Sequence, residues 1–219
     1  MWCKTKEKVM NSPHIGSTRA RRWSPLEYNV APRKLARLPR DIRLRDGLKL
    51  RLRELSIADR ERLKAFFSSC SQEAIRYRFM SSMKAPSDSL LDYLADADGS
   101  HHVALIVTQG RGDDERIVAE SRYVILKDQP YAADIAFLVL DEMQRRGIAT
   151  LLIHELMDIA CRLGVTRFSA DVLADNQPML SLLRKMGQPL SAAVSQGVIH
   201  VEFPIARRED YERRGHRVP

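Results

Sequence analysis

Hydrophobic and polar positions change their period along the chain, and this change separates a helical stretch from a strand-rich one. Over 46–54, DGLKLRLRE, leucines alternate with charges, which predicts a half-buried strand. Apolar residues then recur at helical spacing in two segments that follow the capping residues Ser56 and Ser71, and in a short third helix over 87–96. The period typical of strands begins at 101.

Three apolar strands separated by two turns are expected over 101–109, 116–126 and 133–140, in the pattern of an antiparallel meander. A helix over about 146–163 ends at Gly164, and a strand over 166–173 follows. The strand–helix–strand unit over 133–173 predicts a right-handed crossover.

A further helix begins with Asn176 as its cap and ends at Gly187, and a hairpin turns at Gln196–Gly197. The fold class is therefore α/β (α+β), with one mixed sheet on which helices pack.

The composition is that of a soluble globular protein, with 44% hydrophobic and 29% charged residues among 219. No apolar run approaches the ~18 residues of a membrane helix, and the N-terminus lacks the apolar segment of a secretory signal. The three cysteines are widely spaced, which favours neither a disulfide framework nor a paired zinc site. We expect a reduced, cytoplasmic setting.

The net charge of +8 is concentrated near the N-terminus, where residues 1–40 hold ten Lys or Arg and two Glu. A basic segment of this kind is typical of a solvated, disordered leader. The alternatives are a segment that contacts nucleic acid or an acidic membrane surface, and an organelle transit peptide. The predicted organisation is a basic tail over 1–44, a folded domain over 45–205 and a charged C-terminal tail over 206–219.

The stretch DEMQRRGIATLLIHEL, residues 141–156, carries the strongest candidate chemistry. Gly147 stands where an apolar strand meets an amphipathic helix, and Gln144, Arg145 and Arg146 precede it. Free N–H groups at a helix start bind anions, and a glycine permits close approach of the ligand. The alternative is an ordinary turn with solvated arginines. The stretch matches neither the Walker motif nor GxGxxG.

The same stretch resembles the acetyl-CoA-binding motif of the GNAT N-acetyltransferases, V-x-x-x-x-[QR]-x-x-G-x-[GA], from Val139 through Gln144 and Gly147 to Ala149. The segment NQPMLSLLRKMG, which begins at Asn176, is similar to a later helix of that family. The resemblance covers about residues 45–205. It implies a GNAT fold, with a mostly antiparallel sheet, a central parallel pair and helices on both faces.

Four segments are also similar to the bacterial protein-lysine acetyltransferase group: SQEAIRYRF, AESRYVIL, ADIAFLVLDEMQRRGIA and SADVLADNQPMLSLLRKMG. In that group the GNAT domain often accompanies an acyl-CoA-ligase-like or cyclic-nucleotide-binding domain, and neither fits in this chain. The resemblance implies acetyl-CoA as cosubstrate. The implied contacts are strand backbone with the pantetheine arm, loop amides with the pyrophosphate, and a polar contact from the later helix. The residues concerned are Phe137, Leu138, Val139, Gln144, Arg145, Arg146, Gly147, Ile148, Ala149, Thr150 and Asn176.

Attack of an amine on the thioester requires loss of a proton, since a lysine has a pKa near 10.4. The resemblance places Asp134 where the lysine acetyltransferases carry a glutamate base. The side chain of Asp134 is one methylene shorter than a glutamate. It therefore acts as the base directly or through a water molecule, or it has no catalytic role and is only the residue that starts the strand. Asp141 and Glu142 are fallback bases or solvated turn residues. Many GNATs carry a tyrosine in the later helix that can protonate the leaving thiolate, and Leu183 occupies its place here. The phenylalanine that commonly follows the closing glycine of that helix is Gln188.

Other candidates favour structural roles. His101 and His102 lack a third ligand at metal spacing, so no metal site is expected. His154 is expected to be polar surface, and Cys161 a small core residue. Residues 76–79 lie on an expected helix whose counterpart in GNATs lines the side of the site where the acceptor amine binds.

The resulting hypothesis is an acetyl-CoA-dependent N-acetyltransferase that acts by direct attack of an amine, with a protein lysine as acceptor. A small-molecule amine is an alternative acceptor. A second class of function is a CoA-binding sensor or interaction module, with the basic tail as the only segment suited to nucleic acid.

Overall fold

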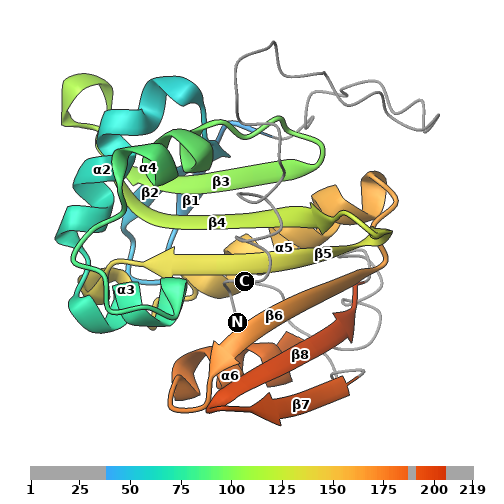
Figure 1. Cartoon of the computed structure of the whole chain (residues 1–219). Coiled ribbons are helices and arrows are strands. Elements are labelled where there is room, and N and C mark those ends of the chain that lie inside the picture. The colour runs from blue at the N-terminus through green and yellow to red at the C-terminus, as the bar shows by residue number, and fades with distance from the viewer. Residues whose placement is uncertain (1–37, 187–190, 206–219) are drawn as a thin grey trace, which may run out of the picture. The chain divides into compact units, whose positions relative to one another are not determined.

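The computed structural model describes residues 38–186 and 191–205, which form one eight-stranded sheet (Figure 1). The spatial order of the strands is β1-β2-β3-β4-β5-β6-β8-β7. Their bounds are β1 (Arg40–Arg43), β2 (Lys49–Glu54), β3 (His102–Gln109), β4 (Arg116–Leu126), β5 (Gln129–Val139), β6 (Arg167–Leu173), β7 (Ser191–Ser195) and β8 (Val198–Pro204).

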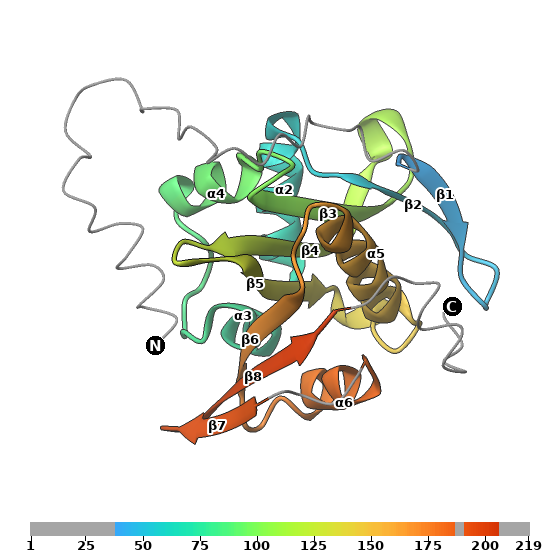
Figure 2. The same ribbon diagram turned by 90° about the vertical axis from the view of Figure 1, so that its right-hand side faces the viewer.

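Helices cover both faces of this sheet. The longest of those described, α5, lies on one face, and α2, α3 and α4 lie on the other (Figure 2). The α-helices are α2 (Arg60–Ser69), α3 (Gln72–Phe79), α4 (Asp88–Ala95), α5 (Ile148–Arg162) and α6 (Gln177–Met186), and the 3-10 turns are η1 (Ile57–Asp59), η2 (Gly112–Asp114) and η3 (Asp141–Met143). Within the described ranges, none of the helices has the length and apolar character to traverse a bilayer.

Every neighbouring pair of strands in this sheet is antiparallel except β5 and β6. The strands β3, β4 and β5 form the predicted meander, and α5 makes the connection from β5 to its parallel neighbour β6. The mixed, mostly antiparallel sheet with a central parallel pair is therefore confirmed.

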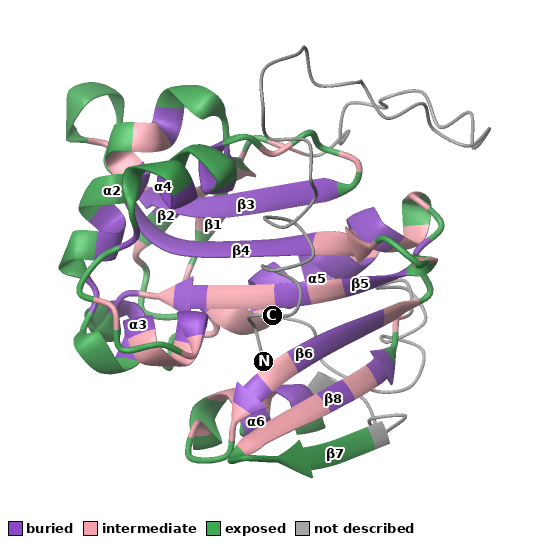
Figure 3. Ribbon diagram, in the orientation of Figure 1, coloured by how far each residue is buried: buried purple, intermediate pink, exposed green. Residues whose placement is uncertain are grey.

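The core lies where both faces are covered. β3 and the first two thirds of β4 are buried almost throughout, whereas β8 alternates between buried and partly exposed residues (Figure 3). Tyr123 on β4, Phe168 on β6 and Phe203 on β8 are among the largest fully buried side chains, and they pack in one aromatic row. This row holds the diverging part of the sheet to the central strands.

Two of the three predicted capping residues start their helices as expected, whereas Ser56 precedes the 3-10 turn η1 and Asp59 is the N-cap of α2. Ser71 Oγ accepts a hydrogen bond from Ala74 N at 3.2 Å, and Asn176 Oδ1 accepts one from Met179 N at 3.1 Å. Each bond satisfies an N–H group that has no partner inside its helix. The hairpin turn is also confirmed, because Gln196 and Gly197 both have positive φ, as a two-residue turn of type I′ requires.

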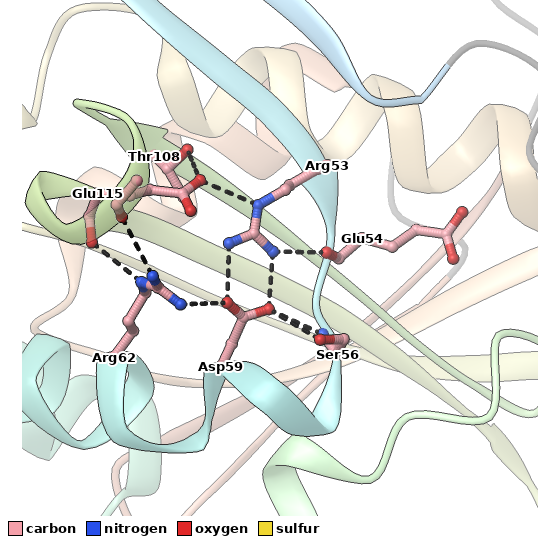
Figure 4. A network of polar contacts seen from close by, with 8 residues as sticks. Arg53, Glu54, Ser56, Asp59, Arg62, Thr108 and Glu115 are labelled. Carbon is pink, nitrogen blue, oxygen red and sulfur yellow. Dashed lines mark hydrogen bonds and ion pairs between the residues drawn. The ribbon is translucent and has the colours of Figure 1, made fainter.

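A network of charges joins the first helical turns to the sheet (Figure 4). Asp59, at the end of η1, accepts two hydrogen bonds from Arg53 on β2, at 2.7 and 2.8 Å. Arg53 also donates to Glu115, which accepts a bond from Thr108 on β3. Asp59 is only 2% exposed, so this pair fixes the start of α2 against the sheet.

Several boundaries differ from those predicted; β2, for example, starts at Lys49 rather than at residue 46. The strand β1 lies inside 1–44, the segment assigned to the tail; it has four residues and no buried one, so it leaves little hydrophobic pattern. β5 starts at Gln129 rather than 133, because the turn after β4 needs only two residues. α5 starts at Ile148 rather than 146, because Arg145 and Gly147 have φ of +60° and +87°, which a right-handed helix excludes. The predicted helix end at Gly187 lies outside the described residues.

Candidate functional site

The parallel strands β5 and β6 stay paired over a short stretch and then diverge. Their register joins Ala132–Asp134 to Arg167–Ser169, and it does not continue over Ile135–Val139. β5 remains paired with β4 over this stretch, and β6 remains paired with β8. Figure 1 shows the two strands separating toward their carboxyl ends. We call this region, between 135–139 of β5 and 170–173 of β6, the β5–β6 divergence.

The edge of β5 presents backbone groups toward the divergence. Leu140 N–H donates to the carbonyl oxygen of Val118 on β4 at 3.0 Å. Because consecutive strand residues direct their backbone groups to opposite edges, those of Val139 and Phe137 point away from β4. Both residues are partly exposed, whereas Leu138 between them is buried. An extended ligand chain could pair with this edge as an added strand does.

The loop after β5 carries a run of backbone N–H groups without acceptors. In the part of the chain that the structure describes, no hydrogen bond involves the N–H groups from Arg145 to Thr150; the first is that of Leu151 to the Gly147 carbonyl, at 2.9 Å. The positive φ of Arg145 and Gly147 turns successive N–H groups toward one side, the arrangement of an anion-binding nest. With the positive end of α5, the loop can hold an anion such as a diphosphate.

Gly147 is required by its conformation and not by crowding. A Cβ built on it would meet no described atom within 4 Å, but its φ of +87° strains any other residue. The surface over the loop therefore stays open for a ligand on the side where a Cβ would project.

The three polar residues before Gly147 have different roles in the structure. Gln144 Nε2 donates to the Val139 carbonyl at 3.2 Å, so it joins the loop to the edge of β5. Arg146 forms an ion pair with Asp46, in the loop before β2, at 2.7 Å. Arg145 is exposed, and its side chain has neither a hydrogen bond nor an ion pair within the described ranges. Arg145 is thus the arginine of the pair that is available to an anion.

Asp134 lies at the closed end of the divergence. It is the last residue of β5 paired with β6, and its Oδ1 accepts a hydrogen bond from Ser169 Oγ at 3.3 Å. Burial, together with the negative charge of Asp171, raises the pKa of Asp134 to about 7, although Ser169 and Arg78 act in the opposite direction. The side chain keeps some exposure while protein surrounds most of it. A carboxyl group with this pKa can accept a proton near neutral pH.

A buried group of charges stands beside Asp134 on the same face of the sheet. Glu120 on β4 forms an ion pair with Arg122 and a longer one, at 3.7 Å, with Arg78 on α3. Arg122 also contacts His102 at 2.7 Å, and burial, then the charge of Arg122, lowers the pKa of His102 to about 4. His102 is therefore a neutral partner in this group.

The helix α3 is fixed to both sides of the divergence. Ser71, its cap, donates from N and Oγ to the carboxylate of Asp141 after β5, at 3.1 and 2.9 Å. Further along α3, Arg76 forms an ion pair with Asp175 in the turn after β6, and the Tyr77 hydroxyl lies 3.4 Å from the Asp175 carbonyl oxygen. α3 therefore joins the turns that follow the two diverging strands.

The structure assigns other contacts to both fallback bases. Asp141 is an exposed turn residue, as expected, and its carboxylate accepts both hydrogen bonds from Ser71. Glu142 is exposed and forms an ion pair with Arg116 at 3.5 Å. Asn176 uses its carbonyl oxygen for the α6 cap, which leaves its amide N–H groups for other partners. Leu183, in the position of the tyrosine, is buried in α6.

The prediction for His154 was wrong. His154 is 5% exposed, and its position on α5, which packs against the meander, explains the burial.

Cys161 is partly exposed and so lies at the margin of the core, whereas Cys70 is buried, and burial raises its thiol pKa to about 12. Among the described residues, no group of three or more His, Cys, Asp or Glu side chains could hold a metal ion.

The sequence did not identify Asp171 and His200. Asp171 follows Ser169 on one face of β6, and His200 stands opposite Asp171 on β8, with Nδ1 2.6 Å from Asp171 Oδ1. The alternation of polar residues along each strand was visible, but the contact joins residues 29 positions apart. Only the register of β6 with β8 brings them together.

Comparison with known proteins gives a consistent result. Residues 67–188 match the family model described as Acetyltransferase (GNAT) family. The chain is similar to the acetyltransferase Pat of Mycolicibacterium smegmatis, with 32% identity over 160 residues, or 72% of this chain and 47% of Pat. It is also similar to the acetyltransferase PA5475 of Pseudomonas aeruginosa, with 29% identity over 66% of this chain and 77% of that protein. The chain thus spans about half the length of Pat.

Among solved structures, the GNAT domain of S. lividans PAT is similar, with a TM-score of 0.70 and 30% identity. The match covers 76% of this chain and 97% of that domain.

Proposed function

The chain belongs to the acetyltransferase (GNAT) family, and from this premise we propose that it transfers the acetyl group of acetyl-CoA to an amine, with a protein lysine side chain as the acceptor. The observation that carries the proposal is a combination beside β5 and β6. Among the described residues, the N–H groups from Arg145 to Thr150 have no hydrogen bond and the edge of β5 over 135–139 has no strand partner, and the Asp134 carboxyl group lies between the two strands. A diphosphate, an extended arm and an amine would each have a suitable contact there.

In this proposal the loop binds the diphosphate. The N–H groups of Arg145 to Thr150 donate to its oxygens, helped by the dipole of α5 and by the Arg145 side chain. Gln144 keeps the loop joined to β5. The backbone of Phe137 and Val139, with Leu138 buried between them, pairs with the pantetheine arm as an added strand would. The Asn176 amide group contacts the arm from the other side of the divergence.

Acetyl-CoA supplies an activated thioester when it is bound. Asp134 takes a proton from the acceptor ammonium, so that an N–H bond breaks and an O–H bond forms on the carboxylate. The neutral amine then attacks the acetyl carbon directly, the N–C bond forms, the C–S bond breaks, and CoA leaves as a thiolate, which is a good leaving group without a specific acid. The thiolate takes the surplus proton from the nitrogen, so that the products are a neutral amide and CoA thiol. The absence of a tyrosine at Leu183 is compatible with this step.

Support for a protein lysine as the acceptor comes from the relatives, since two of the matches named above are Pat proteins. The acceptor assignment would be tested with the full chain, acetyl-CoA and a panel of three amines: a capped peptide with one lysine, spermidine and an arylamine. Release of CoA thiol and the mass of each product would be measured. Transfer to the peptide supports the proposal, and transfer to spermidine or the arylamine alone would favour a small-molecule acceptor.

Cofactor binding would be tested separately by thermal unfolding. Acetyl-CoA at about 100 times its Kd should stabilise the fold by about 2.7 kcal/mol, a shift of several degrees. Stabilisation without transfer to any amine would favour a CoA-binding sensor. No stabilisation at millimolar acetyl-CoA would contradict the proposed cosubstrate.

A further inference from the structure

A row of polar side chains continues from Asp134 across β6 and β8 on one face of the sheet. The register places Asp134 beside Ser169, and Ser169 beside Glu202. One step further along β6, Asp171 stands beside His200. Because residues two apart on a strand share a face, these side chains lie on the face that also carries α3. Together they form an acidic surface next to the proposed base.

Asp171 has a distinct position in this row, because it borders the divergence. The pairing of β5 with β6 ends at Asp134 and Ser169, so no β5 residue is paired beside Asp171. A ligand held between the strands would have Asp134 at the closed end and Asp171 on the β6 side. The charge of Asp171 already acts on Asp134 in this arrangement. The two carboxyl groups therefore flank the same position from two different strands.

His200 fixes the orientation of Asp171. Its Nδ1 lies 2.6 Å from Asp171 Oδ1, and since an ionised carboxylate can only accept, Nδ1 carries the proton. Its Nε2 lies 3.6 Å from Glu202 Oε1. Burial opposes protonation, but the hydrogen bond to Asp171 and the charges of both carboxylates raise the pKa of His200 above its ordinary value. Asp171 is thus held with one oxygen on His200, and its other oxygen has no hydrogen bond or ion pair with any residue that the structure describes.

The Asp171–His200 pair is not needed to hold the fold. The His200 side chain is 44% exposed and that of Asp171 27%, and ion pairs at such exposure contribute little stability. The packing of this part of the sheet depends instead on Phe168 and Phe203, which are fully buried on the opposite face. A role in recognition accounts better for a carboxylate oriented at the divergence.

We propose that Asp171 is a specificity-determining residue for the acceptor, held in place by His200, and that the acceptor it selects is a primary alkyl ammonium group such as a lysine side chain. This inference rests on the proposed acetyl transfer. The ammonium binds between Asp134 and Asp171. Asp134 removes one proton, and Asp171 accepts a hydrogen bond from the remaining N–H groups, which keeps the nitrogen lone pair toward the thioester.

The charges around this position favour a cation. Asp171 and Glu202 face it from β6 and β8, and Asp134 from β5, whereas the facing cations are Arg78 from α3 and His200 from β8. Arg78 is itself paired with Glu120, and His200 with Asp171. An arylamine, which is neutral near pH 7, would gain little from two carboxylates.

The test compares Asp171→Asn with wild type and with the control Asp88→Asn. The control makes the same change of side chain in another exposed ion pair, that of Asp88 on α4 with Arg60 on α2, which has no part in the divergence. Steady-state rates would be measured for the full chain with acetyl-CoA and the capped single-lysine peptide. We expect the KM for the peptide to rise about tenfold or more in Asp171→Asn, as loss of a charged hydrogen-bond partner implies. The KM for acetyl-CoA should change less than about twofold, and the control should retain both values.

Two further variants keep the result interpretable. His200→Gln should raise the peptide KM less than Asp171→Asn, because the carboxylate remains but is no longer fixed, and Asp171→Glu should recover part of the loss. Equal unfolding temperatures for all variants would exclude misfolding as the cause of a changed KM. An unchanged peptide KM in Asp171→Asn would overturn the inference, as would equal increases for the peptide and acetyl-CoA.

The failure of this inference and that of the proposed function give different results. If wild type acetylates the arylamine and not the peptide, the selection of an alkyl ammonium by Asp171 is wrong while acetyl transfer stands. If wild type transfers to no amine and acetyl-CoA does not stabilise it, the proposed function is wrong, and the inference falls with it. If acetyl-CoA stabilises the protein but the peptide is not a substrate, only the acceptor assignment is overturned.

Discussion

The Nε2 group of Gln144 donates a hydrogen bond to the carbonyl oxygen of Val139 at 3.2 Å, which joins the two ends of the loop between β5 and α5. The two residues are the first and second fixed positions of the motif recognised in the sequence. This contact explains the spacing of the motif. Gln144 follows Val139 by five positions, and with the turn η3 between them the Gln144 side-chain amide reaches the backbone of Val139 at the strand edge. The loop is thereby held beside the backbone that the proposal gives to the pantetheine arm.

Replacement of Gln144 by glutamate should therefore weaken acetyl-CoA binding. The carboxylate would repel both the Val139 carbonyl oxygen and the diphosphate, so we expect the Kd to rise about tenfold or more, equivalent to ~1.4 kcal/mol. Isothermal titration with acetyl-CoA would measure this change. Gln144→Met, which removes the donor without adding charge, should have a smaller effect. Equal affinity of Gln144→Glu and wild type would show that the diphosphate does not bind at this loop.

Gly147→Ala should abolish most of the stabilisation by acetyl-CoA. A residue with a Cβ resists the φ of +87°, so the loop N–H groups would lose their common direction. The matched control is Gly164→Ala, since Gly164 has φ of +83° and equally open surroundings but lies at the other end of α5. Both variants should unfold at similar temperatures without ligand. If Gly147→Ala still gains several degrees from acetyl-CoA, as Gly164→Ala should, the anion site is elsewhere.

The activity of wild type should rise with pH through about 7, because Asp134 acts as a base only when ionised and its pKa is raised to about 7. Asp134→Asn should lower kcat by about 10²- to 10⁴-fold without a large change in acetyl-CoA affinity. The pH profile of kcat/KM and a binding titration on the variant would measure the two effects. A variant that retains wild-type kcat would show that another group, or water alone, removes the proton.

Asp134 should also lower the stability of the fold at alkaline pH. The pKa of Asp134 is raised in the folded state, so the folded state favours the protonated carboxyl group. The contribution of this group to the free energy of unfolding is complete below its unfolded pKa near 3.9 and is lost as the pH rises through about 7. Asp134→Asn should therefore raise the unfolding temperature by a few degrees at pH 8 and by less at pH 5. The same difference at both pH values would contradict a raised pKa.

The local parts of this structure could be predicted from the sequence, because each depends on neighbouring residues. The caps Ser71 and Asn176, the meander and the Gln196–Gly197 turn follow from short patterns of residue type. The place of Gly147 between a strand and a helix is also as predicted, and the anion site expected there from the physics of helix ends stays a prediction.

The parts that could not be predicted depend on pairing between distant strands. The end of β5–β6 pairing at Asp134 has no signature in either strand alone, and the contact of Asp171 with His200 needs the register of β6 with β8. The bond from Ser71 to Asp141 likewise joins residues 70 positions apart. Register is set by the whole sheet and its core, so a single sequence does not specify it by local preference.

The ion pair of Asp59 with Arg53 should contribute to the stability of the fold. Asp59→Asn should destabilise the fold by about 3 kcal/mol at pH 7, because it leaves the largely buried Arg53 guanidinium without its main partner. Burial opposes ionisation, but the hydrogen bonds from Arg53 and Ser56 hold the pKa of Asp59 below its usual value. The contribution of Asp59 is therefore present above the unfolded value near 3.9 and is lost as pH falls through the lower folded value.

Thermal unfolding of wild type and Asp59→Asn between pH 3 and 7 would test both the size and the sign. The two curves should converge as the pH falls, since protonation of Asp59 removes in wild type what the substitution has already removed. The control is Asp88→Asn, which breaks an exposed pair with Arg60 and should change the unfolding temperature little. A constant difference between wild type and Asp59→Asn across this range would show that the variant loses packing and not a charge interaction.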